Sequence, residues 1–152
     1  MSLKVNEIAP NFKLFNQDDD LVEFNNIKNK TILFFYPKDN TPGCTKEAIG
    51  FSENLEKINS FGYTVFGISK DTTKKHKNFV EKYNLTVQLL SDFEQDTCEK
   101  YGVWVEKSMY GKKYFGIERS TFLIDKYKKI IHVWNKVKVA NHLQEVIALL
   151  NK

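Results

Sequence analysis

Cys44 is the residue whose type and position indicate chemistry most clearly. It follows an apolar and aromatic run, residues 31–36, which has the length of a strand buried on both faces. Pro37 ends that strand because proline cannot donate to a ladder, and Thr41 and Pro42 then form a typical helix start, with threonine as the cap and proline at the first helical position. The sequence therefore predicts Cys44 in the first turn of a helix that follows a buried strand.

A thiol at that place is expected to be reactive. Unpaired N–H groups and the positive end of a helix dipole stabilise an anion, and they can lower the pKa of a cysteine from about 8.5 to between roughly 3.5 and 7.5. The thiolate formed in this way is the nucleophile. The alternative is that Cys44 is a small buried apolar side chain, as most cysteines in cytosolic chains are. Its position alone leaves both interpretations open.

The helix after Cys44 is expected to be amphipathic. Apolar residues follow the cysteine at steps of four, three, four and three, which places them on its own face of the helix. Gly62 stands where a left-handed residue would end the helix. Cys44 should therefore face the core from a shallow pocket. The apolar residues are Ala48, Phe51, Leu55 and Ile58.

The rest of the chain predicts an α/β fold. A short N-terminal hairpin precedes the cysteine segment, a strand, a helix and a strand follow it, and a second hairpin and a closing helix come last. This order implies a mixed central sheet flanked by helices, in a single domain over residues 1–152. The expected strands are 11–16, 22–24, 63–69, 87–90, 121–124 and 130–134, and the expected helices lie within 71–83, 92–101 and 141–150.

Three local features carry separate expectations. Residues 109–116 are polar and flanked by glycine, and they predict an excursion without regular structure. The hairpin tip, residues 125–128, contains no glycine, so a positive φ there would cost about 1 kcal/mol. The last helix is expected to start at an Asn141 cap reinforced by Gln144.

Composition excludes several classes of protein. The net charge of +4 is spread among interspersed charges of both signs, which argues against binding to nucleic acid or to an acidic membrane surface. Two cysteines and no charged-then-apolar leader favour a reducing compartment such as the cytoplasm, and no apolar run approaches the roughly 20 residues that span a bilayer. The histidines His76, His132 and His142 lack ligand spacing, so no metal or other cofactor is expected.

The segment YPKDNTPGCT, residues 36–45, contains P-x-x-x-T-x-x-C and closely resembles the active-site segment of Q-type peroxiredoxins, also called bacterioferritin-comigratory proteins. The resemblance continues through LLSD (89–92), YGVW (101–104), EKS (106–108) and GIERSTFLID (116–125), and so covers nearly the whole chain. It implies a thioredoxin-like fold and a thiol-dependent peroxidase with an antioxidant role. The Cys44 thiolate would attack hydrogen peroxide or an organic hydroperoxide and become a sulfenic acid.

The resemblance also implies a cradle around the peroxide. Lowering a cysteine pKa from about 8.5 to near 6 raises the thiolate fraction at pH 7 by at most about 30-fold, so efficient catalysis needs donors aimed at the oxygens as their bond breaks. Thr41 matches the family threonine that orients peroxide and thiolate, and Pro37 matches the proline that shields the pocket. Backbone N–H groups around Gly43 and Cys44 would complete the cradle.

Arg119 matches the family arginine that reaches the thiolate and the peroxide. It is the only arginine beside 22 lysines, and it offers a rigid fork of donors that stays charged. The alternative for Arg119 is a surface salt bridge at the edge of a strand. Glu47 matches a polar position that supports this arginine, and its alternative is an exposed acid of the first helical turn, favoured by the dipole.

The sequence departs from the family where the resolving cysteine often stands. Five residues after Cys44 the chain has Ile49, so a disulfide within the same helix is impossible. Cys98 is a possible resolving cysteine. The preferred alternative is a one-cysteine enzyme regenerated by thioredoxin, glutaredoxin or glutathione.

Two other functions stay open from the residues alone. A dithiol oxidoreductase would need C-x-x-C, and Glu47 occupies the second position, so only a monothiol disulfide oxidoreductase is compatible. A non-catalytic thioredoxin-fold binding module would use Cys44 only as a structural residue. Q-type relatives are often monomers, so a monomer is expected, while the preferred peroxide is not encoded in any residue pattern.

Overall fold

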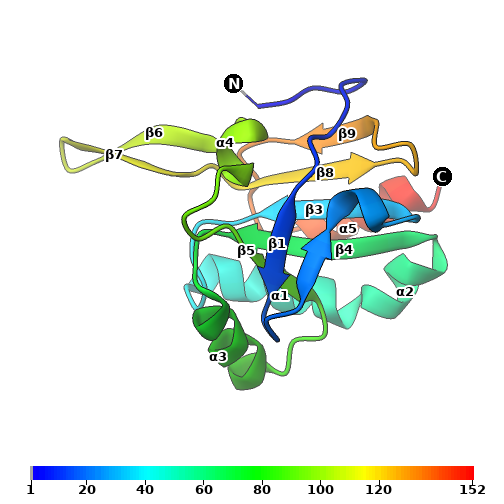
Figure 1. Ribbon diagram of the computed structural model, residues 1–152, viewed down its shortest axis with the longest axis horizontal. Helices are drawn as coiled ribbons and strands as arrows, with labels where there is room; N and C mark the ends of the chain where they lie inside the picture. The colour runs from blue at the N-terminus through cyan, green and yellow to red at the C-terminus, as the bar shows by residue number, and fades with distance from the viewer. Residues whose placement is uncertain (1) are drawn as a thin grey trace.

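The computed structural model describes residues 2–152 (Figure 1). Its strands are β1 (Lys13–Asn16), β2 (Leu21–Glu23), β3 (Lys30–Phe35), β4 (Tyr63–Ser69), β5 (Gln88–Ser91), β6 (Trp104–Met109), β7 (Lys112–Ile117), β8 (Ser120–Ile124) and β9 (Ile130–Trp134). Its helices are the 3-10 turn η1 (Phe24–Asn26) and α1 (Pro42–Glu53), α2 (Leu55–Ser60), α3 (Thr73–Tyr83), α4 (Thr97–Lys100) and α5 (His142–Leu150). Seven strands form one sheet in the order β2-β1-β5-β4-β3-β8-β9, and β6 and β7 form a separate hairpin.

Strand β3 lies inside the sheet and leads directly to the cysteine loop. It pairs parallel with β4, with Ile32 opposite Val65, and antiparallel with β8, with Phe35 opposite Ser120. All of its residues except Lys30 are buried, as the continuous apolar run predicts. The mixed sheet of the expected α/β, thioredoxin-like fold is thus confirmed, and the start of β8 lies beside the carboxyl end of β3.

Two apolar cores lie on opposite faces of this sheet. Because side chains alternate along a strand, Leu33 and Phe35 face one core, while Ile32 and Phe34 face the other. Helices α1, α2, α3 and α5 pack on the face of Ile32 and Phe34, whereas α4, η1 and the N-terminal segment pack on the opposite face. The expected helices on both faces are confirmed, although the second face holds only short ones.

The helix that carries Cys44 is shorter than the apolar pattern predicts. It ends at Glu53, and α2 begins at Leu55 after a break at Asn54, whose side-chain amide donates to the carbonyl of Gly50 at 2.8 Å. Asparagine competes for backbone hydrogen bonds and so interrupts a helix at such a position. Gly62 has the expected left-handed conformation, with φ of 90°.

Residues 109–116 correct the sequence prediction, because they belong to the regular hairpin β6–β7, which projects from the body of the protein (Figure 1). Tyr110 and Gly111 both have positive φ, 52° and 78°, as the central pair of a two-residue hairpin turn requires. Tyrosine is an unusual first residue for such a turn. The hairpin is also exposed on both faces over much of its length, so no apolar alternation marks its strands.

Two further local expectations have different outcomes. Lys128 at the β8–β9 tip has φ of 70°, so the strain anticipated for a non-glycine residue is present. Asn141 precedes α5 but has φ of 66° and makes no side-chain cap, so the predicted capping interaction with Gln144 is wrong.

No helix within residues 2–152 is long and apolar enough to span a membrane.

Candidate active site

Cys44 lies at the third residue of α1 and is 1% exposed. The helix starts at Pro42, as predicted, and Thr41 is extended with φ of −98° and ψ of 155°. The Thr41 hydroxyl does not cap the helix, which corrects the sequence prediction. It donates instead to the carbonyl of Lys38 at 3.0 Å and closes the loop before the helix. Pro37 is exposed in the bend after β3.

Arg119 reaches Cys44 from the neighbouring strand. It immediately precedes β8, whose first residue pairs with the last residue of β3, so the sheet brings its side chain to the start of α1. Its Nη2 donates to Cys44 Sγ at 3.2 Å, and its Nη1 donates to Glu47 Oε1 at 2.7 Å. A Cβ at Gly43 would lie 3.3 Å from the same Nη2, so glycine leaves room for the guanidinium. These contacts rule out the alternative of a surface salt bridge for Arg119.

Glu47 is fully buried one turn after Cys44, not exposed to solvent as the alternative interpretation required. Its Oε1 accepts from Arg119, whereas its Oε2 is buried without a hydrogen-bond partner among the described residues. Burial raises the pKa of Glu47 to about 7, against the opposing effect of the Arg119 charge. Burial disfavours the charge of Arg119, but Glu47 and Cys44 together raise its pKa, so the guanidinium stays charged.

Cys98 lies away from this cluster. It belongs to the core on the opposite face of the sheet from Cys44, and it is fully buried in α4. Its backbone N–H donates to Asp92 Oδ2 at 2.8 Å. Burial, followed by the negative charge of Asp92, raises the pKa of the Cys98 thiol far above its ordinary range. Both cysteines are free.

Two histidines occupy buried positions that the sequence pattern did not reveal. His142 Nε2 lies 2.9 Å from Thr121 Oγ1, and burial, followed by the Arg119 charge, lowers the His142 pKa to about 4. His76 lies beneath the loop that leads to Cys44, within hydrogen-bond distance of Asp39. A lone histidine in a polar helix gives no signal in the sequence, because its partners are distant along the chain.

Glu47→Gln is expected to remove a pH dependence from the stability of the fold. Because the pKa of Glu47 is raised from 4.5 to about 7, the folded state holds a proton between these pH values that the unfolded chain releases. The wild-type free energy of unfolding should therefore fall by about 3 kcal/mol, relative to the Glu47→Gln variant, as pH rises from about 4.5 through 7. Urea unfolding across this range measures it.

The matched control for this measurement is Glu53→Gln, because Glu53 is exposed on the same helix. Its free energy of unfolding should follow the wild-type pH dependence. Wild-type and Glu47→Gln profiles that run parallel would show that Glu47 has an ordinary carboxyl environment.

Comparisons with known proteins give the chain a consistent set of relatives. Residues 5–133 match the AhpC/TSA family. The chain is 50% identical to a putative peroxiredoxin bcp from Coxiella burnetii, over 99% of this chain and 100% of that protein. It is 42% identical to peroxiredoxin Bcp from Bacillus subtilis, over 99% of this chain and 96% of that protein.

Solved structures agree with these relatives. A cysteine-to-serine variant of Xylella fastidiosa PrxQ superposes with a TM-score of 0.93 at 33% identity, over 99% of this chain and 97% of that one. The bacterioferritin comigratory protein of Xanthomonas campestris, described for its alkyl peroxide reduction activity, superposes with a TM-score of 0.87 at 36% identity, over 92% of this chain and 90% of that one.

Proposed function

We propose a one-cysteine catalytic cycle for this chain, which belongs to the AhpC/TSA family and is a thiol-dependent peroxidase. The observation that carries the one-cysteine cycle is that Cys44 and Cys98 lie in cores on opposite faces of the central sheet. Sulfurs that form a disulfide need Cα atoms about 4.4–6.8 Å apart. Cys98 would have to leave its core and pass the edge of the sheet to reach Cys44.

In the oxidation step, the Cys44 thiolate attacks one peroxide oxygen. The O–O bond breaks, the second oxygen leaves with the electron pair, and Cys44 becomes a sulfenic acid. The leaving oxygen takes up a proton and departs as water or an alcohol. Arg119 Nη2, which already donates to Cys44 Sγ, is placed to stabilise negative charge as it moves from sulfur to oxygen.

The neighbouring residues then have supporting roles. Glu47 Oε1 accepts from Arg119 Nη1 and so fixes the orientation of the guanidinium. Gly43 leaves space for that guanidinium, and its N–H and that of Cys44 are donors at the start of α1. Thr41 and Pro37 shape the loop that borders the thiol, and the Thr41 hydroxyl can exchange its bond to Lys38 for one to a bound peroxide.

Regeneration then uses a thiol from outside the chain. Its sulfur attacks the Cys44 sulfenic acid and releases water, and a second thiol cleaves the mixed disulfide and restores Cys44. Thioredoxin, glutaredoxin and glutathione are the proposed reductants. The position five residues after Cys44 supports this route, since the half-buried Ile49 stands there in α1.

We also propose that the enzyme acts as a cytoplasmic monomer. Two free cysteines fit a reducing compartment, where structural disulfides are rare. A single chain brings together Cys44, Glu47 and Arg119, so the cluster needs no residue from a second copy.

Cys98→Ala is expected to keep peroxide turnover within about twofold of wild type, whether dithiothreitol or thioredoxin is the reductant. Alanine removes the thiol without placing a new polar group in the core that holds this buried side chain. Turnover is measured as peroxide consumption. Loss of turnover with every thiol, in a variant that remains folded, would make Cys98 the resolving cysteine.

Intact mass provides an independent test of the same cycle. One equivalent of hydrogen peroxide should give a sulfenic acid that a dimedone reagent traps at Cys44, in wild type and in Cys98→Ala alike. A loss of two hydrogens that maps to a bond between Cys44 and Cys98 would overturn the one-cysteine cycle but keep the peroxidase. An unchanged mass would overturn both.

A further inference from the structure

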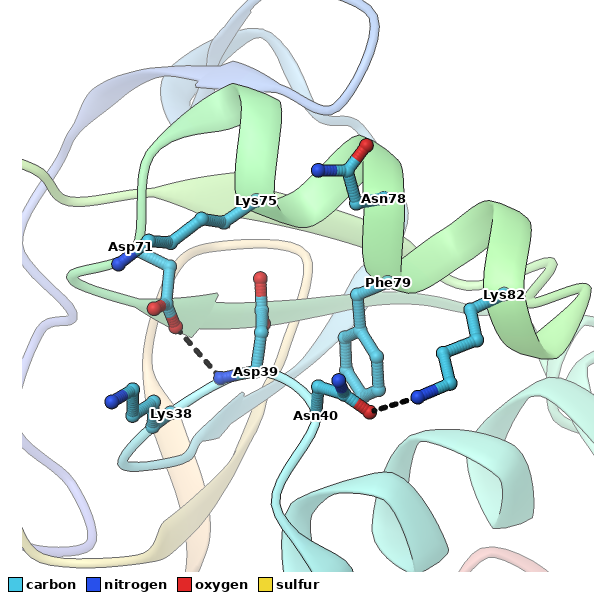
Figure 2. Close-up of a pocket in the computed structure, with 8 residues that line it drawn as sticks. All are labelled: Lys38, Asp39, Asn40, Asp71, Lys75, Asn78, Phe79 and Lys82. Atoms are coloured by element: carbon cyan, nitrogen blue, oxygen red, sulfur yellow. Dashed lines mark hydrogen bonds between the residues drawn. The ribbon is translucent and has the colours of Figure 1, made fainter.

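Asp39, in the loop between β3 and α1, makes hydrogen-bond contacts through both carboxylate oxygens and through its backbone N–H. Its Oδ1 accepts from the Tyr36 hydroxyl at 2.5 Å, and its Oδ2 lies 2.6 Å from His76 Nδ1. Its backbone N–H donates to Asp71 Oδ2 at 2.8 Å, the bond drawn in Figure 2. The loop two residues before Thr41 is therefore attached both to α3, through His76, and to the end of β4, through Asp71.

His76 is the fully buried member of this cluster, and both of its ring nitrogens have partners. Its Nε2 lies 3.0 Å from the carbonyl oxygen of Leu90, which can only accept, so Nε2 carries a proton. Its Nδ1 faces the Asp39 carboxylate, which already accepts from Tyr36. Burial, followed by the negative charge of Asp39, raises the pKa of Tyr36, so its hydroxyl stays a donor. Both ring nitrogens of His76 therefore face acceptors, an arrangement that suits an imidazolium ion paired with the Asp39 carboxylate.

A metal ion is a weaker interpretation of the same residues. Ligand atoms of Asp39, Asp71 and His76 lie within 4.8 Å of one another. However, two ligands of one zinc ion, each bonded at about 2.0 Å, are separated by roughly 3.3 Å, and the 2.6 Å between His76 and Asp39 is a direct hydrogen bond. The pocket beside them is also lined by Lys38, Lys75 and Lys82, which repel a cation (Figure 2).

A second contact holds the same loop to α3. Asn40, which has φ of 61°, accepts at its side-chain oxygen from the Tyr83 hydroxyl at 2.8 Å. The same oxygen accepts from Lys82 Nζ at 3.3 Å, the bond drawn in Figure 2. Two consecutive loop residues thus depend on one helix for their conformation. Of these contacts, the ion pair between His76 and Asp39 is the most deeply buried, with side chains 0% and 5% exposed, and removing one partner leaves an uncompensated charge.

We propose that His76 is a positioning residue for peroxide reduction. Through Asp39 it holds the loop before α1 in the conformation that places Thr41 and the first turn of the helix around Cys44. The role rests on the peroxidase function described above. When the contact between His76 and Asp39 is lost, the loop opens and the donors around the peroxide are no longer held in place. Cys44, which is only 1% exposed in the structure, then becomes accessible.

His76→Gln is expected to change two reactions of Cys44 in opposite directions. Its second-order rate constant with hydrogen peroxide should fall by about 10- to 100-fold, the scale expected when a reacting group is misplaced by about 1 Å. Its alkylation by a bulky maleimide should become faster. Stopped-flow fluorescence and mass spectrometry measure the two rates, and thermal unfolding shows that the variant is folded.

The matched control is Lys75→Gln, an exposed residue of the same helix that lines the same pocket. Both of its rates should stay within about twofold of wild type. Asp39→Asn, which removes the partner charge in the loop, should reproduce the behaviour of His76→Gln. A His76→Gln variant oxidised as fast as wild type would overturn the positioning role alone, whereas a wild type that peroxide does not oxidise would overturn the peroxidase function as well.

A measurement on the wild-type protein tests the charge state without any variant. Long-range ¹H–¹⁵N correlation at neutral pH should show protons on both ring nitrogens of His76, since both face acceptors. His142, whose pKa is lowered to about 4, should show one protonated nitrogen in the same spectrum and provides the internal reference. A neutral ring at His76 would overturn the proposed ion pair.

Discussion

Replacement of Cys44 by serine is expected to abolish peroxide turnover, with a loss of roughly 10⁵-fold or more, the scale seen when an enzyme loses its nucleophile. A serine hydroxyl is not deprotonated near neutral pH, and its oxygen cannot accept a second oxygen from the peroxide as sulfur does in forming a sulfenic acid. The Arg119 guanidinium would still be present, but it can stabilise negative charge on the peroxide oxygen only after a nucleophile has attacked the peroxide.

Peroxide consumption with excess dithiothreitol measures this loss directly. Cys98→Ala is the matched control, since it also removes one buried thiol but is expected to retain turnover. Serine is close in size to cysteine, and Cys44 is 1% exposed, so thermal unfolding of both variants must be compared with wild type. Residual turnover of more than a few per cent in folded Cys44→Ser would exclude Cys44 as the peroxidatic residue.

Local sequence rules predict the helix of Cys44 and the place of the cysteine in its first turn, whereas the role of Cys44 as the nucleophile was implied by the family resemblance. Pro42 begins α1 as its residue type predicts, although Thr41 does not cap the helix, and the apolar run before Pro37 is long and unbroken, so the buried strand before Cys44 follows from pattern. The approach of Arg119 to Cys44 was implied by the family resemblance, and the structure shows its basis, because Arg119 directly precedes a strand that pairs with β3.

Contacts between distant parts of the chain were not predictable in the same way. From its helical position, Glu47 could either support Arg119 or lie exposed in the first turn. Only its contact with Arg119, 72 residues later in the chain, distinguishes the two environments. His76 is isolated in a lysine-rich helix, and its partner Asp39 lies 37 residues earlier in a segment that looks like an ordinary polar turn. The exposed β6–β7 hairpin lacks the apolar alternation that marks a strand, so its regular structure was missed.

Arg119→Lys is expected to lower kcat/KM for peroxide by about 10²- to 10³-fold, the cost of removing one donor aimed at developing charge. Lysine keeps the positive charge, but it is a point charge on a flexible chain. The guanidinium donates to Cys44 Sγ from Nη2 and to Glu47 Oε1 from Nη1 at the same time, and its planar fork fixes both directions. An ammonium group that pairs with Glu47 loses the orientation needed at the sulfur.

Arg119→Gln separates the charge from the geometry and should be impaired at least as much as Arg119→Lys. It also leaves the buried Glu47 without a cation, which raises the pKa of Glu47 further, so the stability of the variant should go on falling as pH rises above 7, where that of wild type levels off. The double variant Arg119→Gln with Glu47→Gln removes that unpaired charge. It should recover stability at pH 8 but not activity, which distinguishes the electrostatic role of Arg119 at Cys44 from its structural pairing with Glu47. Activity in Arg119→Lys within about threefold of wild type would show that charge alone suffices and would exclude the proposed role of the fork.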